Sequence, residues 1–189
     1  MSRRDELADQ ATDYVLNHGI VGLTLRPLAA AINTSDRMLM YHFGDKDTLI
    51  AEILERSNER AVAVVNDLRR AGSVRHAVLG YWRAWGDPEF EGCLRVYVQT
   101  AGLGLLGREP YLSASRRSNT SWNTALAGYL TASGAPKARA RRIALLVDAT
   151  LLGLYLDWPV EGDSPRVAQA VRDLADAAQA LSDSRRANA

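Results

Sequence analysis

The sequence predicts an all-helical protein in which a small N-terminal bundle precedes a larger helical domain. Apolar residues recur at spacings of three and four along most of the chain, whereas strict alternation is confined to short runs. Glycine, proline and capping residues interrupt this pattern at intervals typical of helices. These observations favour α-helices and argue against a sheet.

The first predicted helix covers about residues 3–17, where Leu7, Ala11 and Val15 share one stripe and Gly19 supplies a left-handed C-terminal cap. A polar tail, residues 182–189, is expected to fray. Between these ends, the pattern predicts helices at about 25–32, 36–43, 46–70, 74–85, 89–106, 110–133, 136–158 and 165–181.

Capping residues surround the second and third predicted helices. Thr24 and Ser35 can cap their N-termini, and Asn33 between them tolerates the positive φ that a tight interhelical turn requires. Gly44 stops the third helix, and Asp45 can cap the fourth. Two short helices around such a turn form the layout of a helix-turn-helix unit.

Composition and length exclude several classes of protein. The chain has 189 residues, with 23 basic and 22 acidic side chains, so net charge alone does not indicate a polyanion-binding protein. Cys93 is the single cysteine, so an internal disulfide and a cysteine-based zinc cluster are excluded, and a reducing cytoplasm is expected. The N-terminus lacks the apolar core of a signal peptide. The most apolar run, Ile143 to Leu156, is shorter than the roughly 20 residues that cross a bilayer, so no membrane span is expected.

The third predicted helix has the chemistry to read DNA in a major groove. Arg37 can bind guanine O6 and N7, Met38 and Met40 can pack on thymine methyl groups, and Tyr41 and His42 can bond to phosphates. Asp36 has two interpretations, an acceptor for cytosine N4 or an acid favoured by the helix dipole, of which the second has the greater weight.

Three segments near the N-terminus form a signature with regular spacing: Gly22-Leu23-Thr24-Leu25-Arg26-Pro27-Leu28-Ala29, Tyr41-His42-Phe43 and Lys46-Asp47-Thr48-Leu49. In these segments the chain resembles the TetR family of transcriptional regulators. The match extends over about residues 3–56 with its spacing preserved, and the rest of the chain agrees only in helical character and length. Two departures are Asn33, where the family usually has glycine, and Met40, where it usually has tyrosine.

The resemblance implies roles for matching positions. Arg26 would reach a base or phosphate, Thr24 and Lys46 would contact phosphates, Tyr41 and His42 would contact the backbone, and Arg37 and Met38 would read bases. It also implies a DNA-binding domain at 1–46, a linker helix at about 46–70 and an effector-binding and dimerisation domain at 47–189. The full set of candidate DNA-binding residues is Thr24, Arg26, Asp36, Arg37, Met38, Met40, Tyr41, His42 and Lys46.

Charge within the N-terminal 50 residues does not form a basic stripe. Five basic side chains (Arg3, Arg4, Arg26, Arg37, Lys46) stand against seven acidic ones (Asp5, Glu6, Asp9, Asp13, Asp36, Asp45, Asp47). We expect the acids of the first helix to face solvent, while Arg26, Arg37 and Lys46 converge on one face. Three amphipathic helices could also form a bundle without any DNA-binding role, but the combined signature favours DNA binding.

The C-terminal two-thirds is expected to supply a dimer interface, because a single helix-turn-helix unit reads too few base pairs to select a genomic site. The alternative for the last two apolar stripes is core within one chain. The predicted interface residues are Ile143, Leu146, Val147, Thr150, Leu151 and Leu154, together with Val167, Val171, Leu174, Ala178 and Leu181.

Aromatic side chains with polar neighbours also predict a small-molecule site in this region, as the resemblance implies. Each aromatic taken singly is more often a core residue. Asp148, isolated in an apolar stretch, is expected to bond to a hydroxyl across the dimer or to a polar effector. The predicted ligand-binding residues are Trp82, Trp85, Tyr97, Trp122, Asp148 and Tyr155.

The alternative function is an enzyme that binds a nucleotide cofactor through the glycine-rich segment 102–107, preceded by Val96-Tyr97-Val98 as a possible strand. No acidic residue follows at the required distance to hold a ribose, and Pro110 interrupts the helix that should open there. Cys93 has no implied catalytic partner, and His18, His42 and His76 lack metal-ligand spacing. We therefore expect no enzyme activity, cofactor or metal, but a cytoplasmic, ligand-responsive regulator that binds a palindromic operator as a homodimer, with repression as the expected sign.

Overall fold

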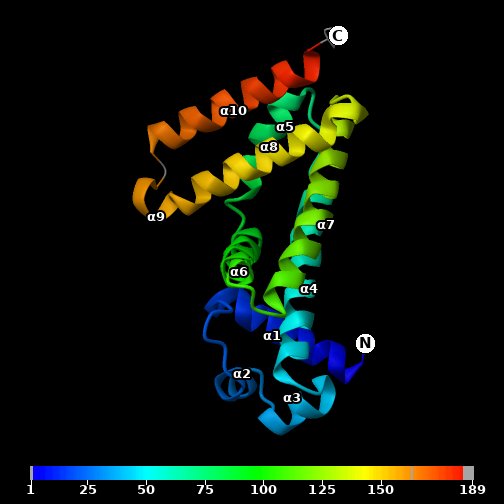
Figure 1. The fold of residues 1–189 in the computed structure, drawn as a ribbon, viewed down its shortest axis with the longest axis vertical. Helices are drawn as coiled ribbons and strands as arrows, with labels where there is room; N and C mark the ends of the chain where they lie inside the picture. The colour runs from blue at the N-terminus through cyan, green and yellow to red at the C-terminus, as the bar shows by residue number, and fades with distance from the viewer. Residues whose placement is uncertain (1, 163, 185–189) are drawn as a thin grey trace. The chain divides into compact units, whose positions relative to one another are not determined.

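The computed structural model describes residues 2–162 and 164–184, and within these ranges the chain forms ten helices and no strand (Figure 1). The all-helical prediction is therefore confirmed for the described part of the chain. The helices are α1 (Arg3–His18), α2 (Leu25–Ala31), α3 (Asp36–Phe43), α4 (Lys46–Asp67), α5 (Val74–Ala84), α6 (Pro88–Leu105), α7 (Tyr111–Ala132), α8 (Lys137–Leu156), α9 (Trp158–Glu161) and α10 (Pro165–Asp183).

Most helix ends follow from the predicted caps. Gly19 and Gly44, which follow α1 and α3, have φ values of 84° and 83°. Glycine adopts such positive values without steric cost, so these two residues can end the helices. Asp45 accepts a 2.7 Å hydrogen bond from the Thr48 amide at the start of α4. Differences are small: α4 ends before residue 70, Pro136 precedes α8 as its N-cap instead of lying in its first turn, and α9 was not predicted.

The predicted polar tail at 182–189 begins later than expected. Ser182 and Asp183 belong to the last turn of α10, and Ser184 is its C-cap. The frayed tail predicted for residues 185–189 lies outside the described residues.

The chain divides into two compact units, one containing residues 1–63 and 87–121 and the other residues 64–86 and 122–189. We call them unit 1 and unit 2. Helices α4 and α7 contribute residues to both. This division differs from the sequence-based boundary after residue 46, because the first part of α4, all of α6 and the first part of α7 belong to the same compact unit as α1–α3.

Unit 1 is organised by α6, which holds the C-terminal end of α1. The Arg95 guanidinium donates a 2.7 Å hydrogen bond to the Leu16 carbonyl. The Gln99 amide oxygen accepts from the backbone amides of Ile20 (2.7 Å) and Val21 (3.3 Å) in the following loop. One carbonyl in the last turn of α1 and two amides of the following loop thus gain hydrogen-bond partners from a helix about 80 residues away in the chain.

The acidic side chains of α1 do not simply face solvent, as we expected, but pair with arginines of α4. Arg56 reaches Asp5 (3.2 Å) and Asp9 (2.9 Å), as well as Glu52 on its own helix (3.1 Å). Arg60 reaches Asp13 (2.6 Å). These carboxylates therefore hold α1 against α4 within unit 1.

In unit 2, α10 packs its apolar stripe on α5 and α8. The prediction that the last two stripes form a subunit interface is wrong for most of their residues, because these are buried within the chain. Leu146 is the exposed member on α8, while Thr150, Leu154 and Leu181 are half-buried. The buried residues are Ile143, Val147, Leu151, Val167, Val171, Leu174 and Ala178.

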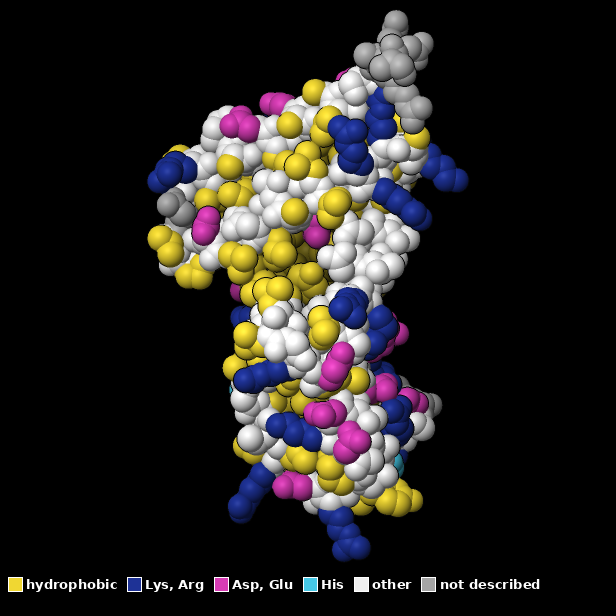
Figure 2. Space-filling model, viewed as in Figure 1, with side chains coloured by type: hydrophobic (Ala, Val, Ile, Leu, Met, Phe, Trp, Pro, Cys, Tyr) yellow, Lys and Arg dark blue, Asp and Glu magenta, His cyan; other side chains and the backbone are white. Residues whose placement is uncertain are grey.

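Helix α8 leaves an apolar side uncovered. Leu145, Leu146 and Leu156 are exposed, and Figure 2 shows hydrophobic side chains gathered over the lobe that contains α8 and α9. By length and composition the stretch Lys137–Val160 is apolar enough to cross a membrane, with mean hydropathy 1.5 and 22% of its most apolar window buried. The 14-residue estimate from the sequence was too short, because the helical stretch begins before Ile143 and continues beyond Leu156. A single such helix is weak evidence for a membrane span, since helices of soluble proteins also meet this criterion.

Replacing Arg56 by alanine should destabilise unit 1, because three carboxylates would lose a shared cation whose side chain is only 20% exposed. We expect the free energy of unfolding to fall by roughly 1–3 kcal/mol, between the values for exposed and buried ion pairs. Urea denaturation measures this loss. Arg60→Ala is the matched control and should cost less, since its closest partner, Asp13, is 61% exposed; an equal or larger loss there would contradict the central position of Arg56.

Candidate functional sites

The turn between α2 and α3 has the geometry that its sequence predicts. Asn33 has φ 53°, and the Thr34 amide donates to the Ala29 carbonyl at 2.9 Å. The Ser35 hydroxyl caps α3 by accepting from the Met38 amide at 3.2 Å. Thr24 differs from expectation: it occupies the N-cap position of α2, but its side chain makes no capping hydrogen bond.

Helix α3 presents three of the predicted DNA-reading residues on its outer side. Leu39 and Phe43 are buried, and with 100° of rotation per residue Arg37, Met38 and Tyr41 lie on the opposite side. Tyr41 is 78% exposed. Asp36 is exposed at the N-terminus of α3, whereas Met40 and His42 flank the outer side and are half-buried.

His42 is poorly placed for the phosphate contact that the sequence predicted. Its Nε2 atom is buried and has no hydrogen-bond partner in the described part of the chain. The ring stands edge-on to Tyr41, with centroids 5.1 Å apart and planes at 79°. A contact through Nε2 would therefore require the ring to turn outward.

Three basic residues around this helix pair have no ion-pair partner among the described residues: Arg26, Arg37 and Lys46. Arg26 and Arg37 are exposed, and Lys46 is half-buried. By contrast, Arg4 and Arg56 are held by Glu52 and the acids of α1. Basic side chains extend from the end of the molecule that carries α2 and α3 (Figure 2).

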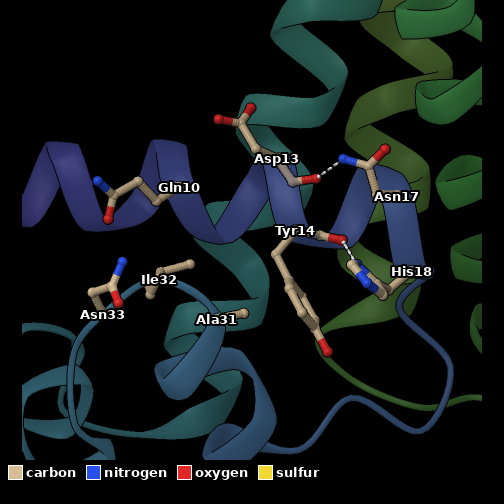
Figure 3. A pocket seen from close by; sticks show the side chains of 8 residues that line it. All are labelled: Gln10, Asp13, Tyr14, Asn17, His18, Ala31, Ile32 and Asn33. Atoms are coloured by element: carbon tan, nitrogen blue, oxygen red, sulfur yellow. Dashed lines mark hydrogen bonds between the residues drawn. The ribbon is translucent and has the colours of Figure 1, made fainter.

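Unit 1 also has an open pocket of about 410 Å³ between α1 and the turn that follows α2. Tyr14 and His18 stack at 4.1 Å on its wall, and the His18 ring nitrogen Nδ1 bonds to the Tyr14 carbonyl (Figure 3). The carboxylate of Asp13 turns from this pocket toward α4, where it meets Arg60 (Figure 3). The pocket therefore offers stacked rings and amides, with its one acid already paired.

The predicted ligand-binding aromatics separate into the two units. Tyr97 belongs to unit 1, whereas Trp82, Trp85, Trp122 and Tyr155 belong to unit 2. In unit 2 the rings form a connected group: Trp85 contacts Trp82 and Tyr155, each at 5.7 Å between centroids.

Two further rings that the sequence analysis did not select, Tyr81 and Trp158, complete this group. Tyr81 lies 5.8 Å from Trp85 and 6.2 Å from Trp122, and Trp158 lies 6.1 Å from Trp82. Tyr81 is fully buried within the apolar stripe of α5, so periodicity assigns it to the core. We call these six rings (Tyr81, Trp82, Trp85, Trp122, Tyr155, Trp158) the aromatic cluster.

Asp148 of α8 bonds to two of these rings within its own chain. The expected partner was a hydroxyl across a dimer or a polar effector, and the intrachain hydroxyl of Tyr81 takes the place of the first. The Oδ1 atom of Asp148 accepts from the Trp122 indole at 2.6 Å and from the Tyr81 hydroxyl at 3.3 Å. Burial raises the pKa of Asp148, although these two hydrogen bonds oppose the shift. Burial, and then the Asp148 charge, raises the pKa of Tyr81 well above its ordinary value.

The glycine-rich segment 102–107 does not form a nucleotide-binding turn. Val96, Tyr97 and Val98 are helical, and α6 continues to Leu105. Gly104 instead permits close packing, since a Cβ there would lie 3.2 Å from the Leu112 Cα. The strand, turn and helix that a dinucleotide fingerprint requires are therefore missing from this segment.

Comparison with solved structures shows that the fold is shared with transcriptional regulators. A transcriptional regulator from Rhodococcus sp. RHA1 is 22% identical, with a TM-score of 0.76 over 97% of this chain and 100% of the other. A TetR transcriptional regulator from Legionella pneumophila is 16% identical, with a TM-score of 0.70 over 94% and 97%. The multidrug binding protein EbrR, complexed with imidazole, is 24% identical, with a TM-score of 0.64 over 95% and 96%. No family model and no curated protein matches the sequence.

The fold is therefore that of the TetR-like regulators over nearly the whole chain. This agrees with the resemblance of residues 3–56, which rests on sequence motifs.

Asp148→Asn should stabilise the protein at neutral pH, because the amide oxygen still accepts from Trp122 and Tyr81 while a buried charge is removed. A raised carboxyl pKa means that folding disfavours the ionised form. Wild-type stability therefore gains on acidification through the folded pKa of Asp148, above its ordinary value of 3.8.

The advantage of Asp148→Asn in Tm should be greatest near pH 7 and shrink toward pH 4, as protonation neutralises the wild-type side chain. Thermal unfolding of both proteins across this pH range measures the difference in Tm. The other titrating groups are the same in both proteins, so their contributions cancel in this difference. If the variant had a lower Tm than the wild type at pH 7 and the deficit shrank at low pH, folding would favour the ionised form of Asp148, contrary to our interpretation.

Proposed function

We propose that this protein is a ligand-responsive transcriptional regulator of the TetR family, which binds a palindromic DNA operator as a homodimer and acts as a repressor. The observation that carries the proposal is the outer side of α3, where Arg37, Met38 and Tyr41 are exposed and Arg37 has no ion-pair partner among the described residues. The shared fold and the N-terminal motifs support it independently.

The DNA-binding residues divide into two proposed roles. Arg37 and Met38 read base edges in the major groove, with Met40 and Asp36 at the border of that surface. Thr24, Arg26, Tyr41 and Lys46 contact the backbone. His42 supports Tyr41 through its ring contact more than it binds phosphate.

A second copy of the chain is the proposed partner of the uncovered side of α8. Leu145, Leu146 and Leu156 provide apolar area on this side, while exposed Ala149 and Gly153 allow two helices to approach closely. This surface replaces the interface residues suggested by periodicity, most of which are core. In a cytoplasmic dimer the exposed apolar side of α8 would be buried between the two subunits, so the helix would not need a membrane to cover it.

A small-molecule effector is proposed to bind unit 2 at the aromatic cluster and to release the operator. EbrR, which has this fold, is a multidrug binding protein known in complexes with imidazole and with proflavin. Release requires that the effector binds the DNA-free conformation more tightly than the DNA-bound one. Helix α4, which has residues in both units, is the covalent route by which such a change would alter the spacing of two α3 helices in a dimer.

Selection of random duplex DNA by the purified protein tests the proposal and should return an inverted repeat. Arg37→Ala should cost about 1–3 kcal/mol per half-site and relax the preference at one position, because a base contact is lost. Lys46→Ala should weaken binding to all sequences alike, because a phosphate contact carries no sequence information.

Gel-shift titrations on the selected site and on scrambled duplex distinguish the two variants. Among the described residues 2–50, the basic side chains without an ion pair are Arg26, Arg37 and Lys46. Few phosphates are then neutralised per subunit, so the slope of log K against log salt should not exceed about ten per dimer. Absence of a palindromic consensus, or the same loss on both duplexes for both variants, would overturn the proposed roles.

Leu146→Arg should dissociate the dimer without unfolding the chain, because this side chain is 41% exposed. Sedimentation equilibrium should show a monomer, and operator affinity should fall because two half-sites no longer act together. Leu105→Arg is the matched control, since Leu105 is 89% exposed in unit 1 and should leave the assembly intact. A dimeric Leu146→Arg protein would refute the assignment of α8.

A further inference from the structure

The carboxylate of Asp148 carries a charge that nothing in the described part of the chain compensates. None of the ion pairs among the described residues includes it. Its two donors, the Trp122 indole and the Tyr81 hydroxyl, are neutral, and both bond to Oδ1. A half-buried negative charge held only by neutral donors is unfavourable unless a cation approaches it.

Both groups that bond to this carboxylate belong to the aromatic cluster. Trp122 and Tyr81 contact it directly, Tyr81 also contacts Trp85, and Trp85 contacts Trp82 and Tyr155. The negative face of an aromatic ring attracts cations, most strongly when the ring is that of tryptophan and water is excluded. The carboxylate and the rings therefore favour the same kind of ligand.

The cluster is accessible to a ligand. Trp82, Trp122, Asp148 and Tyr155 are each half-buried, and Trp158 is exposed. Tyr81 and Trp85, by contrast, are buried. The partly exposed rings and the partly exposed carboxylate therefore give a ligand access to the cluster from solvent.

We propose that the effector is an organic cation with an apolar or aromatic body, and that Asp148 and the aromatic cluster recognise its positive charge. This inference rests on the proposed effector site in unit 2 and specifies the chemistry of its ligand. The rings bury the apolar body of the ligand, and Asp148 discriminates against neutral molecules of the same shape.

Binding of N-methylquinolinium and of its neutral carbon isostere 1-methylnaphthalene tests this proposal in the full-length protein. The two probes share shape and size and differ in charge. Equilibrium dialysis should show the cation bound at least about tenfold more tightly, the ratio that about 1.4 kcal/mol of charge recognition produces.

Asp148→Asn should remove most of this preference while leaving the affinity for 1-methylnaphthalene unchanged, because the hydrogen bonds to Trp122 and Tyr81 persist. Its thermal unfolding establishes that the variant is folded. Asp157→Asn is the matched control, since Asp157 is the exposed C-cap of the same helix, α8, and should leave the preference intact. Trp82→Leu should weaken the cation more than the isostere, because it keeps apolar bulk but removes a ring face.

Equal affinity for the two probes, or an unchanged preference in Asp148→Asn, would overturn the cation assignment while leaving the DNA-binding proposal untouched. A gel shift on the selected operator separates the two questions. If the cation binds with the expected dependence on Asp148 but leaves the operator occupied, the ligand class stands and the proposed release fails.

Discussion

The pairing of the α1 acids with Arg56 and Arg60 is the interaction on which unit 1 depends. It fastens α1 to α4, and α3 lies between these two helices in the sequence and packs its Leu39 and Phe43 into the same core. It also pairs three carboxylates of α1, those of Asp5, Asp9 and Asp13, with arginines of α4. Arg26, Arg37 and Lys46 are then left without ion-pair partners among the described residues, although the first 50 residues contain more acids than bases.

In unit 2, by contrast, a carboxylate has no cation as its partner among the described residues. The apolar stripe of α10 packs on α5 and α8 within the chain, and one apolar side of α8 stays uncovered. The carboxylate, that of Asp148, lies among aromatic rings. A partly buried carboxylate without a cation costs stability, and such groups cluster at sites that bind a ligand or perform a reaction. The stability cost and the proposed recognition of a cation have the same physical origin, the low polarity around Asp148.

Local sequence signals predicted the helix boundaries of unit 1 well because they act over one or two turns. Gly19, Asn33, Ser35 and Gly44 each satisfy a backbone requirement at their own position, and the structure confirms their conformations or caps. Leu39 and Phe43, four residues apart, share the buried side of α3, as the helical period requires. Prediction was weaker where it depended on partners: Thr24 makes no cap, and the α1 acids turn toward α4 instead of solvent.

The sequence by itself determined the helical class and the helix-turn-helix layout, and it supplied the candidate residues for the proposed DNA contact, because capping, periodicity and side-chain chemistry are local properties. The tertiary structure decided which apolar stripe is core and which is exposed, since Val171 and Leu146 have the same chemistry but different neighbours. It also decided that Asp148 meets Trp122 and Tyr81, and that Tyr97 lies in another unit. Such contacts join residues far apart in the chain, and no local pattern specifies them.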